Sequence, residues 1–79
     1  MEPIWPTDDE IKQACDGLTQ HLHSAGILNL SLSLYCQFLV GLTVPMFTKH
    51  KVKKLQGFAL CETLKYGDVK IKLQHLNLI

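Results

Sequence analysis

The first third of the chain has a helical pattern of apolar residues. They recur three and four positions apart, as on one face of a helix, at Ile11, Ala14, Cys15, Leu18, Leu22 and Ala25. Ahead of this stripe, Thr7 and Glu10 have the spacing of a capping box, and the acidic residues around them suit the positive end of the helix dipole. The pattern predicts a helix that begins after Thr7 and ends before Gly26. Residues 1–6, which hold two prolines, are interpreted as a lead-in segment.

A second apolar run predicts the central helix of the fold. Either Asn29 or Ser31 can cap this helix, which extends to about Leu42. Its predicted apolar face consists of Leu34, Tyr35, Phe38, Leu39 and Leu42. Gly41 and Pro45 end the helix, because glycine permits a tight turn and the residue before a proline avoids helical backbone angles.

Two shorter helices are predicted next. Thr48 caps the first, which carries residues 49–55 and turns Val52 and Leu55 inward, so that its four lysines face solvent. The second follows a Gln-Gly break and ends near Tyr66 after about two turns. Its predicted apolar residues are Phe58, Cys61 and Leu64.

The last segment, Asp68 to Leu78, fits two structures. The residues from Val69 to Leu73 alternate as a strand would, whereas Val69, Leu73 and Leu76 also share one face of a helix that starts at Asp68. A lone strand would have no partner, because no other alternating run is present, so the helix is preferred. We therefore predict an all-α fold, with residues 1–79 forming a single small bundle of four to five short helices.

The charge is distributed unevenly along the chain. Residues 1–40 have a net charge of −4 and residues 41–79 a net charge of +5. No arginine is present, so the bidentate contacts that arginine makes to guanine or to carboxylates are not available, and any phosphate contact would be made by lysine as a point charge. A polyanionic partner would therefore meet the second half of the chain.

The composition favours a folded cytoplasmic protein. Hydrophobic residues make up 47% of the chain, too many for a disordered tail, but polar residues interrupt the longest uncharged stretch, which argues against a membrane span. The N-terminal region is acidic where a secretory signal would be basic. The three cysteines, Cys15, Cys36 and Cys61, have neither the number nor the spacing of a disulfide or zinc framework, so we expect them to be buried as small apolar residues.

The sequence has no pattern typical of an enzyme. It lacks a glycine-rich phosphate loop, a zinc-protease motif and a nucleophile elbow, so the chain alone is predicted not to be an enzyme and to hold no cofactor. The positive feature is a cluster of lysines that either forms a solvated helix face or contacts DNA phosphates. The candidate DNA-binding residues are Lys49, His50, Lys51, Lys53 and Lys54, with Lys65, Lys70 and Lys72 as a second patch.

One stretch also resembles a known family. The residues concerned are Phe38-Leu39-Val40-Gly41-Leu42-Thr43-Val44-Pro45, Thr48-Lys49 with Lys51 and Lys54, Phe58-Ala59, and then Leu64, Tyr66, Asp68 and Val69. In this order and without a gap, they are similar to the extreme C-terminal segment of certain bacterial RecQ-family DNA helicases. Where that family has arginines this chain has lysine or other residues, and Ala59 stands where the family has a glycine.

The resemblance implies an accessory domain of a larger enzyme. RecQ helicases are ATP-dependent, translocate 3′ to 5′ on single-stranded DNA and act in recombination and repair. Their ATPase motifs and zinc-binding module lie upstream of this tail. The implied partner is single-stranded or forked DNA, bound weakly and in a salt-dependent manner, in the bacterial cytoplasm. The alternative is a protein-interaction module that docks on the helicase core or on another copy of the domain.

Overall fold

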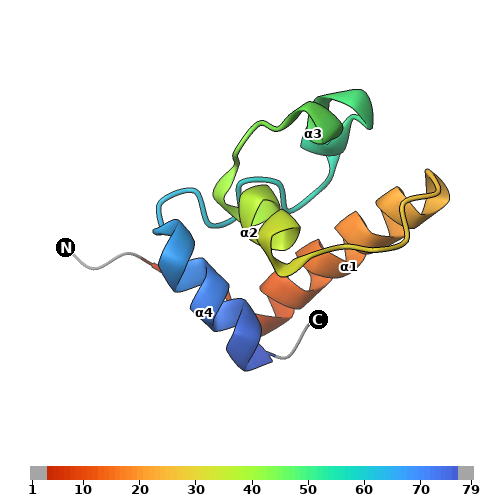
Figure 1. The fold of residues 1–79 in the computed structure, drawn as a ribbon. Helices are drawn as coiled ribbons and strands as arrows, with labels where there is room; N and C mark the ends of the chain where they lie inside the picture. The colour runs from red at the N-terminus through yellow and green to blue at the C-terminus, as the bar shows by residue number, and fades with distance from the viewer. Residues whose placement is uncertain (1–3, 77–79) are drawn as a thin grey trace.

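Four α-helices and one 3-10 helix make up the part of the chain that the computed structural model describes, residues 4–76. Their bounds are Asp8–Ser24 (α1), Leu32–Val40 (α2), Pro45–Lys49 (α3), Val52–Lys54 (the 3-10 helix η1) and Tyr66–Leu76 (α4). No strand occurs in this range, which confirms the predicted all-α fold (Figure 1). The first three residues of the predicted lead-in, and the end of the last segment at Leu78, lie outside the described residues.

Helix α1 follows its predicted pattern closely. The Thr7 hydroxyl accepts from the Glu10 amide at 3.1 Å, and the Glu10 carboxylate accepts from the Thr7 amide at 3.1 Å, so the capping box is formed. The buried residues of the helix are Ile11, Ala14, Cys15, Leu18 and Leu22. Ala25 is exposed because the helix ends before it, and Gly26 follows with φ +88°. Only the last member of the predicted stripe is therefore wrong.

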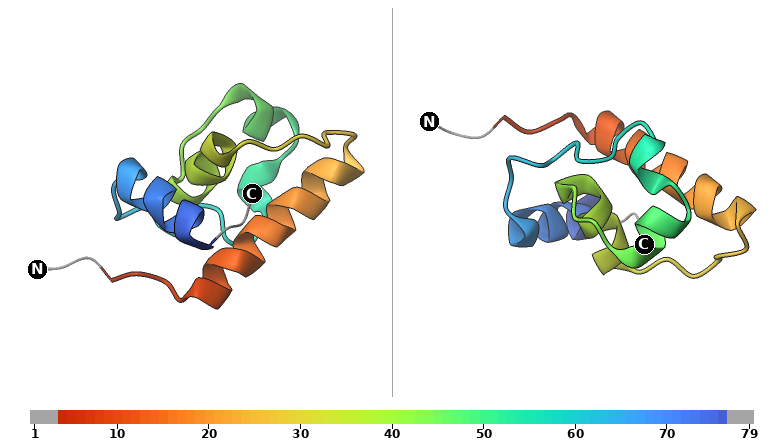
Figure 2. Two further views of the ribbon diagram at one scale, coloured as in Figure 1. Left: turned by 60° about the horizontal axis from the view of Figure 1, so that its bottom comes forward. Right: turned by 90° about the horizontal axis from the view of Figure 1, so that it is seen from above.

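Helix α2 is the centre of the molecule, with α1, α3 and α4 arranged around it (Figure 2). Ser31 is the N-cap and accepts from the Leu34 amide at 3.3 Å, so the cap is Ser31 and not Asn29. The helix ends at Val40 because Gly41 adopts a left-handed conformation with φ +84°. Leu42 consequently lies outside the buried face and is 47% exposed, although it was predicted to belong to it.

The predicted bounds of the third helix are wrong. Helix α3 begins at Pro45 and not after Thr48, because proline fits the first helical position, where an amide hydrogen has no partner in the helix. It ends at Lys49, and Lys51 then adopts a left-handed conformation with φ +57°, which separates α3 from η1. Val52 points inward as predicted and is fully buried, whereas Leu55 is only half-buried.

The helix predicted around Phe58 and Leu64 does not form. Residues 56–64 make consecutive turns, and Ala59 interrupts them with φ +61°. The amide of Ala59 donates to the Phe38 carbonyl at 3.0 Å, and the amide of Cys61 donates to the Leu39 carbonyl at 2.7 Å. These bonds tie two amides of the segment to carbonyls at the end of α2, while other amides of the segment bond the carbonyl three residues back, so the hydrogen bonds of an α-helix do not form. The last segment is a helix, as preferred, and begins two residues earlier than Asp68.

Three phenylalanines join these segments in the core. They are Phe38 of α2, Phe47 of α3 and Phe58 of residues 56–64, which we call the turn segment. Their rings meet edge to face, with centroids 5.8 to 6.5 Å apart. This is the arrangement that aromatic quadrupoles favour. One turn earlier on α2, the Tyr35 hydroxyl hydrogen-bonds with Thr19 of α1. The helix at the centre is therefore fixed to α1, to α3 and to residues 56–64 by specific side chains.

Ala59→Gly is expected to raise the free energy of unfolding by about 0.5–1 kcal/mol. The left-handed conformation costs a non-glycine residue about 1–2 kcal/mol, of which part is offset by the larger entropy of glycine in the unfolded chain. Urea denaturation measures the difference. Ala25→Gly is the control, because Ala25 is exposed and has a negative φ of −90°, so there the same change should lower the stability. Equal losses for the two variants would contradict the prediction.

Candidate nucleic-acid interface

The candidate interface is formed by residues 49–54, which we call the lysine turn. It comprises the last residue of α3, the two residues that follow it, and η1. Backbone hydrogen bonds order it throughout. The amide of His50 donates to Met46 at 3.0 Å and the amide of Lys54 donates to Lys51 at 3.2 Å. The lysine turn is thus a defined structure and not a loose loop, although it is not the single helix that its sequence predicts.

Two buried side chains hold the lysine turn against the core. Phe47 precedes it and Val52 lies within it, and both are 0% exposed. Between and beside these anchors the four lysines Lys49, Lys51, Lys53 and Lys54 are all exposed. The prediction that these lysines clear the buried face is confirmed.

Helix α1 fixes the lysine turn by a contact that the sequence does not reveal. The His21 Nε2 atom lies 2.6 Å from the carbonyl oxygen of His50. A carbonyl can only accept, so Nε2 carries the proton and donates it. His50 itself is half-buried, and it takes part in this hydrogen bond through its backbone carbonyl. Residues 29 positions apart are thereby joined at the C-terminal end of α3.

The lysines of the turn differ from Lys72 in their electrostatic surroundings. Lys72 forms an ion pair with Asp8, with 2.9 Å between Nζ and Oδ1. Within residues 4–76 no other ion pair is present, so Lys49, Lys51, Lys53 and Lys54 have no carboxylate within 4.0 Å there. Four positive charges therefore stand on six consecutive residues with no carboxylate partner in the described part of the chain. Such a site attracts an anion at low ionic strength.

The second predicted patch is not continuous with the lysine turn. Lys70 and Lys72 belong to α4, and Lys65 directly precedes it. Helices α3 and α4 lie on different sides of α2 (Figure 1, Figure 2). Because Lys72 is also paired with Asp8, the structure groups the candidate residues into one unpaired cluster and one separate, partly neutralised set.

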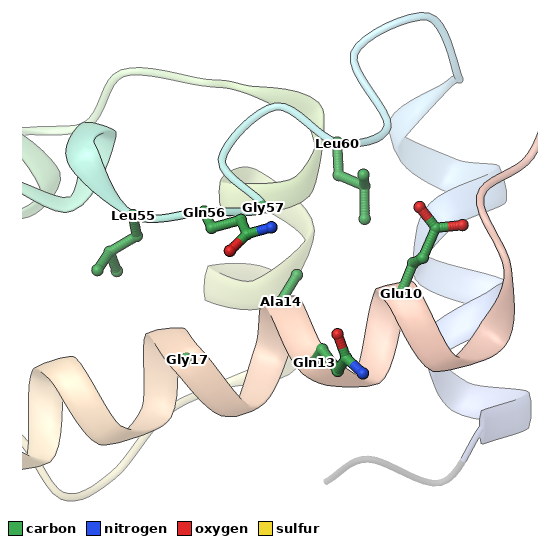
Figure 3. Close-up of a pocket in the computed structure, with 8 residues that line it drawn as sticks. All are labelled: Glu10, Gln13, Ala14, Gly17, Leu55, Gln56, Gly57 and Leu60. Carbon is green, nitrogen blue, oxygen red and sulfur yellow. The ribbon is translucent and has the colours of Figure 1, made fainter.

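A groove begins where the lysine turn ends. It lies between α1 and the segment from Leu55 to Leu60 and has a volume of about 260 Å³ (Figure 3). Its lining residues are Glu10, Gln13, Ala14, Gly17, Leu55, Gln56, Gly57 and Leu60. No periodicity in the sequence indicates this groove, because its walls are brought together only when residues 55–60 cross α1.

The three cysteines are buried and free, as expected for small apolar residues. Burial is the main cause that raises the pKa of the Cys15 thiol to about 12 and the pKa of the Cys61 thiol to about 11. These thiols are therefore neutral and poor nucleophiles near pH 7. Within the described residues, no group of three or more histidine, cysteine or acidic side chains could hold a metal ion, and no helix is long and apolar enough to cross a bilayer.

Comparisons with known proteins give no relative for this chain. A scan against protein-family models, a search of curated proteins and a search of solved structures each found no match. The similarity to the RecQ tail accordingly rests on the sequence motif from Phe38 to Val69 alone.

Proposed function

We propose that this chain is a C-terminal accessory domain of a RecQ-like, ATP-dependent DNA helicase and that it binds the DNA phosphate backbone through the lysine turn. The observation that carries the proposal is the set of four exposed lysines without a carboxylate partner among residues 4–76. Phe47, Val52 and His21 fix the backbone beneath them. Because the backbone is ordered in advance, binding does not incur the cost of ordering a loop.

The roles of the motif residues support kinship with the RecQ tail. Phe38 and Leu39 are completely buried in the core. Gly41 ends α2 in the left-handed conformation, and Pro45 begins α3. Ala59 has a positive φ at the position where the RecQ motif has glycine, the residue that adopts this conformation most easily. Each of these motif residues therefore has a structural role in this fold. The same holds for position 59, where this sequence has alanine in place of the glycine of the motif.

In this proposal the domain contributes affinity and not catalysis. ATP hydrolysis and zinc binding would belong to upstream parts of the parent helicase, which acts in recombination and repair in the bacterial cytoplasm. Because the contacts are made by lysine and not by arginine, binding to single-stranded or forked DNA is weak and largely independent of sequence.

The test is the salt dependence of DNA binding. With a labelled single strand and a labelled fork, fluorescence anisotropy should show binding at low salt that weakens as salt is raised. Each phosphate contact to a single strand contributes a slope of about −0.7 to the plot of log affinity against log salt. The double variant Lys53→Glu/Lys54→Glu should make this slope shallower by about 1.4.

A matched single change controls for net charge. Lys54→Glu and Lys12→Glu alter the charge of the protein equally, but Lys12 is exposed on the acidic helix α1, outside the lysine turn. We expect Lys54→Glu to weaken binding clearly more than Lys12→Glu. The proposal fails if no DNA binds at low salt or if the two variants weaken binding equally.

A second candidate function has an observation of its own. Trp5 and Ile71 are 39% and 54% exposed, and together with His75 they line a shallow hollow on α4. Exposed apolar side chains of this kind favour a protein contact, here with the helicase core or another copy of the domain. Loss of co-purification or of self-association in Ile71→Glu, with DNA binding retained, would support this function.

A further inference from the structure

We propose that the groove between α1 and residues 55–60 receives one unpaired nucleobase of the DNA strand whose phosphates lie on the lysine turn. This inference rests on the proposed function and adds a binding site to it. Its ligand class is a base of single-stranded DNA.

The groove has the size for a small group such as one nucleobase. Its volume of about 260 Å³ is below the roughly 300–1,000 Å³ of sites for drug-sized ligands, which suits one base. Figure 3 shows Gln13 on the α1 side and Gln56 on the opposite side, with Glu10 and Leu60 toward one end and Leu55 toward the other. On the α1 side Gly17 leaves open space, since no atom lies within 4 Å of where its Cβ would stand.

The lining has the chemistry that base recognition requires. Leu55 and Leu60, which are only half-buried, offer apolar surface to the faces of a ring. The carboxamides of Gln13 and Gln56 each carry donors and an acceptor, as the edges of bases do. Neither carboxamide makes a hydrogen bond within residues 4–76, so both are available to a ligand.

The charges decide which part of a nucleotide enters the groove. Glu10 stands at one end, and its carboxylate disfavours a phosphate there. The phosphate is favoured instead at Lys53 and Lys54, which directly precede the wall residue Leu55. This charge distribution therefore favours an uncharged base inside the groove and its phosphate outside it, on the lysine turn.

The test compares two single strands of equal length and charge, one of which carries abasic sites. Both retain every phosphate, so they differ only in the group that the groove would take. We expect the protein to bind the base-containing strand about fivefold to tenfold more tightly. The salt slopes should be the same for both strands, because the number of phosphate contacts is unchanged.

Two variants locate the effect in the groove. Gly17→Leu fills the open space, and Gln56→Ala removes a carboxamide from an exposed side chain. Each should bring the affinity for the base-containing strand close to that for the abasic strand, with an unaltered salt slope. Gln20→Ala, an exposed glutamine of α1 outside the groove, should change neither affinity.

The outcomes separate this inference from the proposed function. Equal binding of the two strands by the wild-type protein, with a normal salt slope, overturns the base site and leaves the lysine turn as a phosphate site. Retention of the preference in both Gly17→Leu and Gln56→Ala also overturns it. If neither strand binds at low salt, the proposed function fails, and the base site fails with it. Should Gly17→Leu not fold, Gln56→Ala decides alone.

Discussion

Replacing Gly57 with alanine is expected to lower the free energy of unfolding by about 3 kcal/mol. Gly57 has φ +103°, which side-chain-bearing residues rarely adopt. A Cβ there would lie 2.5 Å from the Cβ of Ala14 and 3.0 Å from its Cα, so backbone strain and a steric clash act together. Because the Cα belongs to helix α1, rotation of a side chain cannot relieve the clash. In a domain of this size the melting temperature should fall by roughly 12–24 °C.

Two other glycines supply the controls for this experiment. Gly17 and Gly67 lie within α1 and α4, and no atom lies within 4 Å of an added Cβ at either position. Alanine there should raise the stability by about 0.5–1 kcal/mol, because it favours the helix. In addition, Ala14→Gly should cost less in the Gly57→Ala background than in the wild type. A neutral Gly57→Ala would mean that residues 55–60 do not cross α1 as closely as described.

The sequence predicts those helices whose signals are local. Helix α1 could be predicted because Thr7 and Glu10 cap it and a single apolar stripe follows them. For α2, Asn29 and Ser31 were equivalent by residue type, and only the structure distinguishes them. The central helix and the last helix were also predicted as helices, because each has its own periodic apolar face.

The errors lie where long-range contacts decide the chain path. Residues 56–64 contain enough apolar residues at helical spacing to suggest a helix, but the amides of Ala59 and Cys61 bond the carbonyls at the end of α2. Pro45 was taken as the end of one helix, although proline equally well begins the next. A local pattern cannot choose between these options, because the energy difference comes from a partner that is distant in sequence.

In the candidate site, too, the features set by local sequence could be predicted and those set by long-range contacts could not. The exposure of the four lysines of the lysine turn could be predicted, because Val52 marks the inward side of the segment. The bond from His21 to the His50 carbonyl and the groove beside Gln56 could not, since both depend on how α1 packs against residues far along the chain. Gly57 was the one available signal, as a glycine between two turns often marks a close backbone approach.

Raising the pH above about 9 is expected to destabilise the fold through its buried thiols. The pKa of Cys15 is raised from 9.0 to about 12 and that of Cys61 from 9.0 to about 11, in both cases chiefly because burial disfavours the thiolate. Unfolding restores the ordinary value, so above pH 9 the unfolded chain binds fewer protons than the native chain and is favoured. The stabilisation is fully present below pH 9 and is lost as the pH rises toward 11 and 12. At pH 10 the two thiols, with roughly equal shares, should together lower the free energy of unfolding by about 3 kcal/mol.

Urea denaturation between pH 7 and pH 10.5, under reducing conditions, measures this loss. The double variant Cys15→Ala/Cys61→Ala is the matched comparison, because tyrosines and lysines titrate in both proteins and cancel in the difference. Its stability at pH 7 should be lower than that of the wild type, since it loses two buried sulfur atoms. From pH 9 upward, however, its stability should decline less steeply, and the gap between the two proteins should narrow by about 3 kcal/mol by pH 10. Parallel curves would show that the thiols ionise equally in the folded and unfolded chains, which buried cysteines at the junction of α1, α2 and the turn segment should not do.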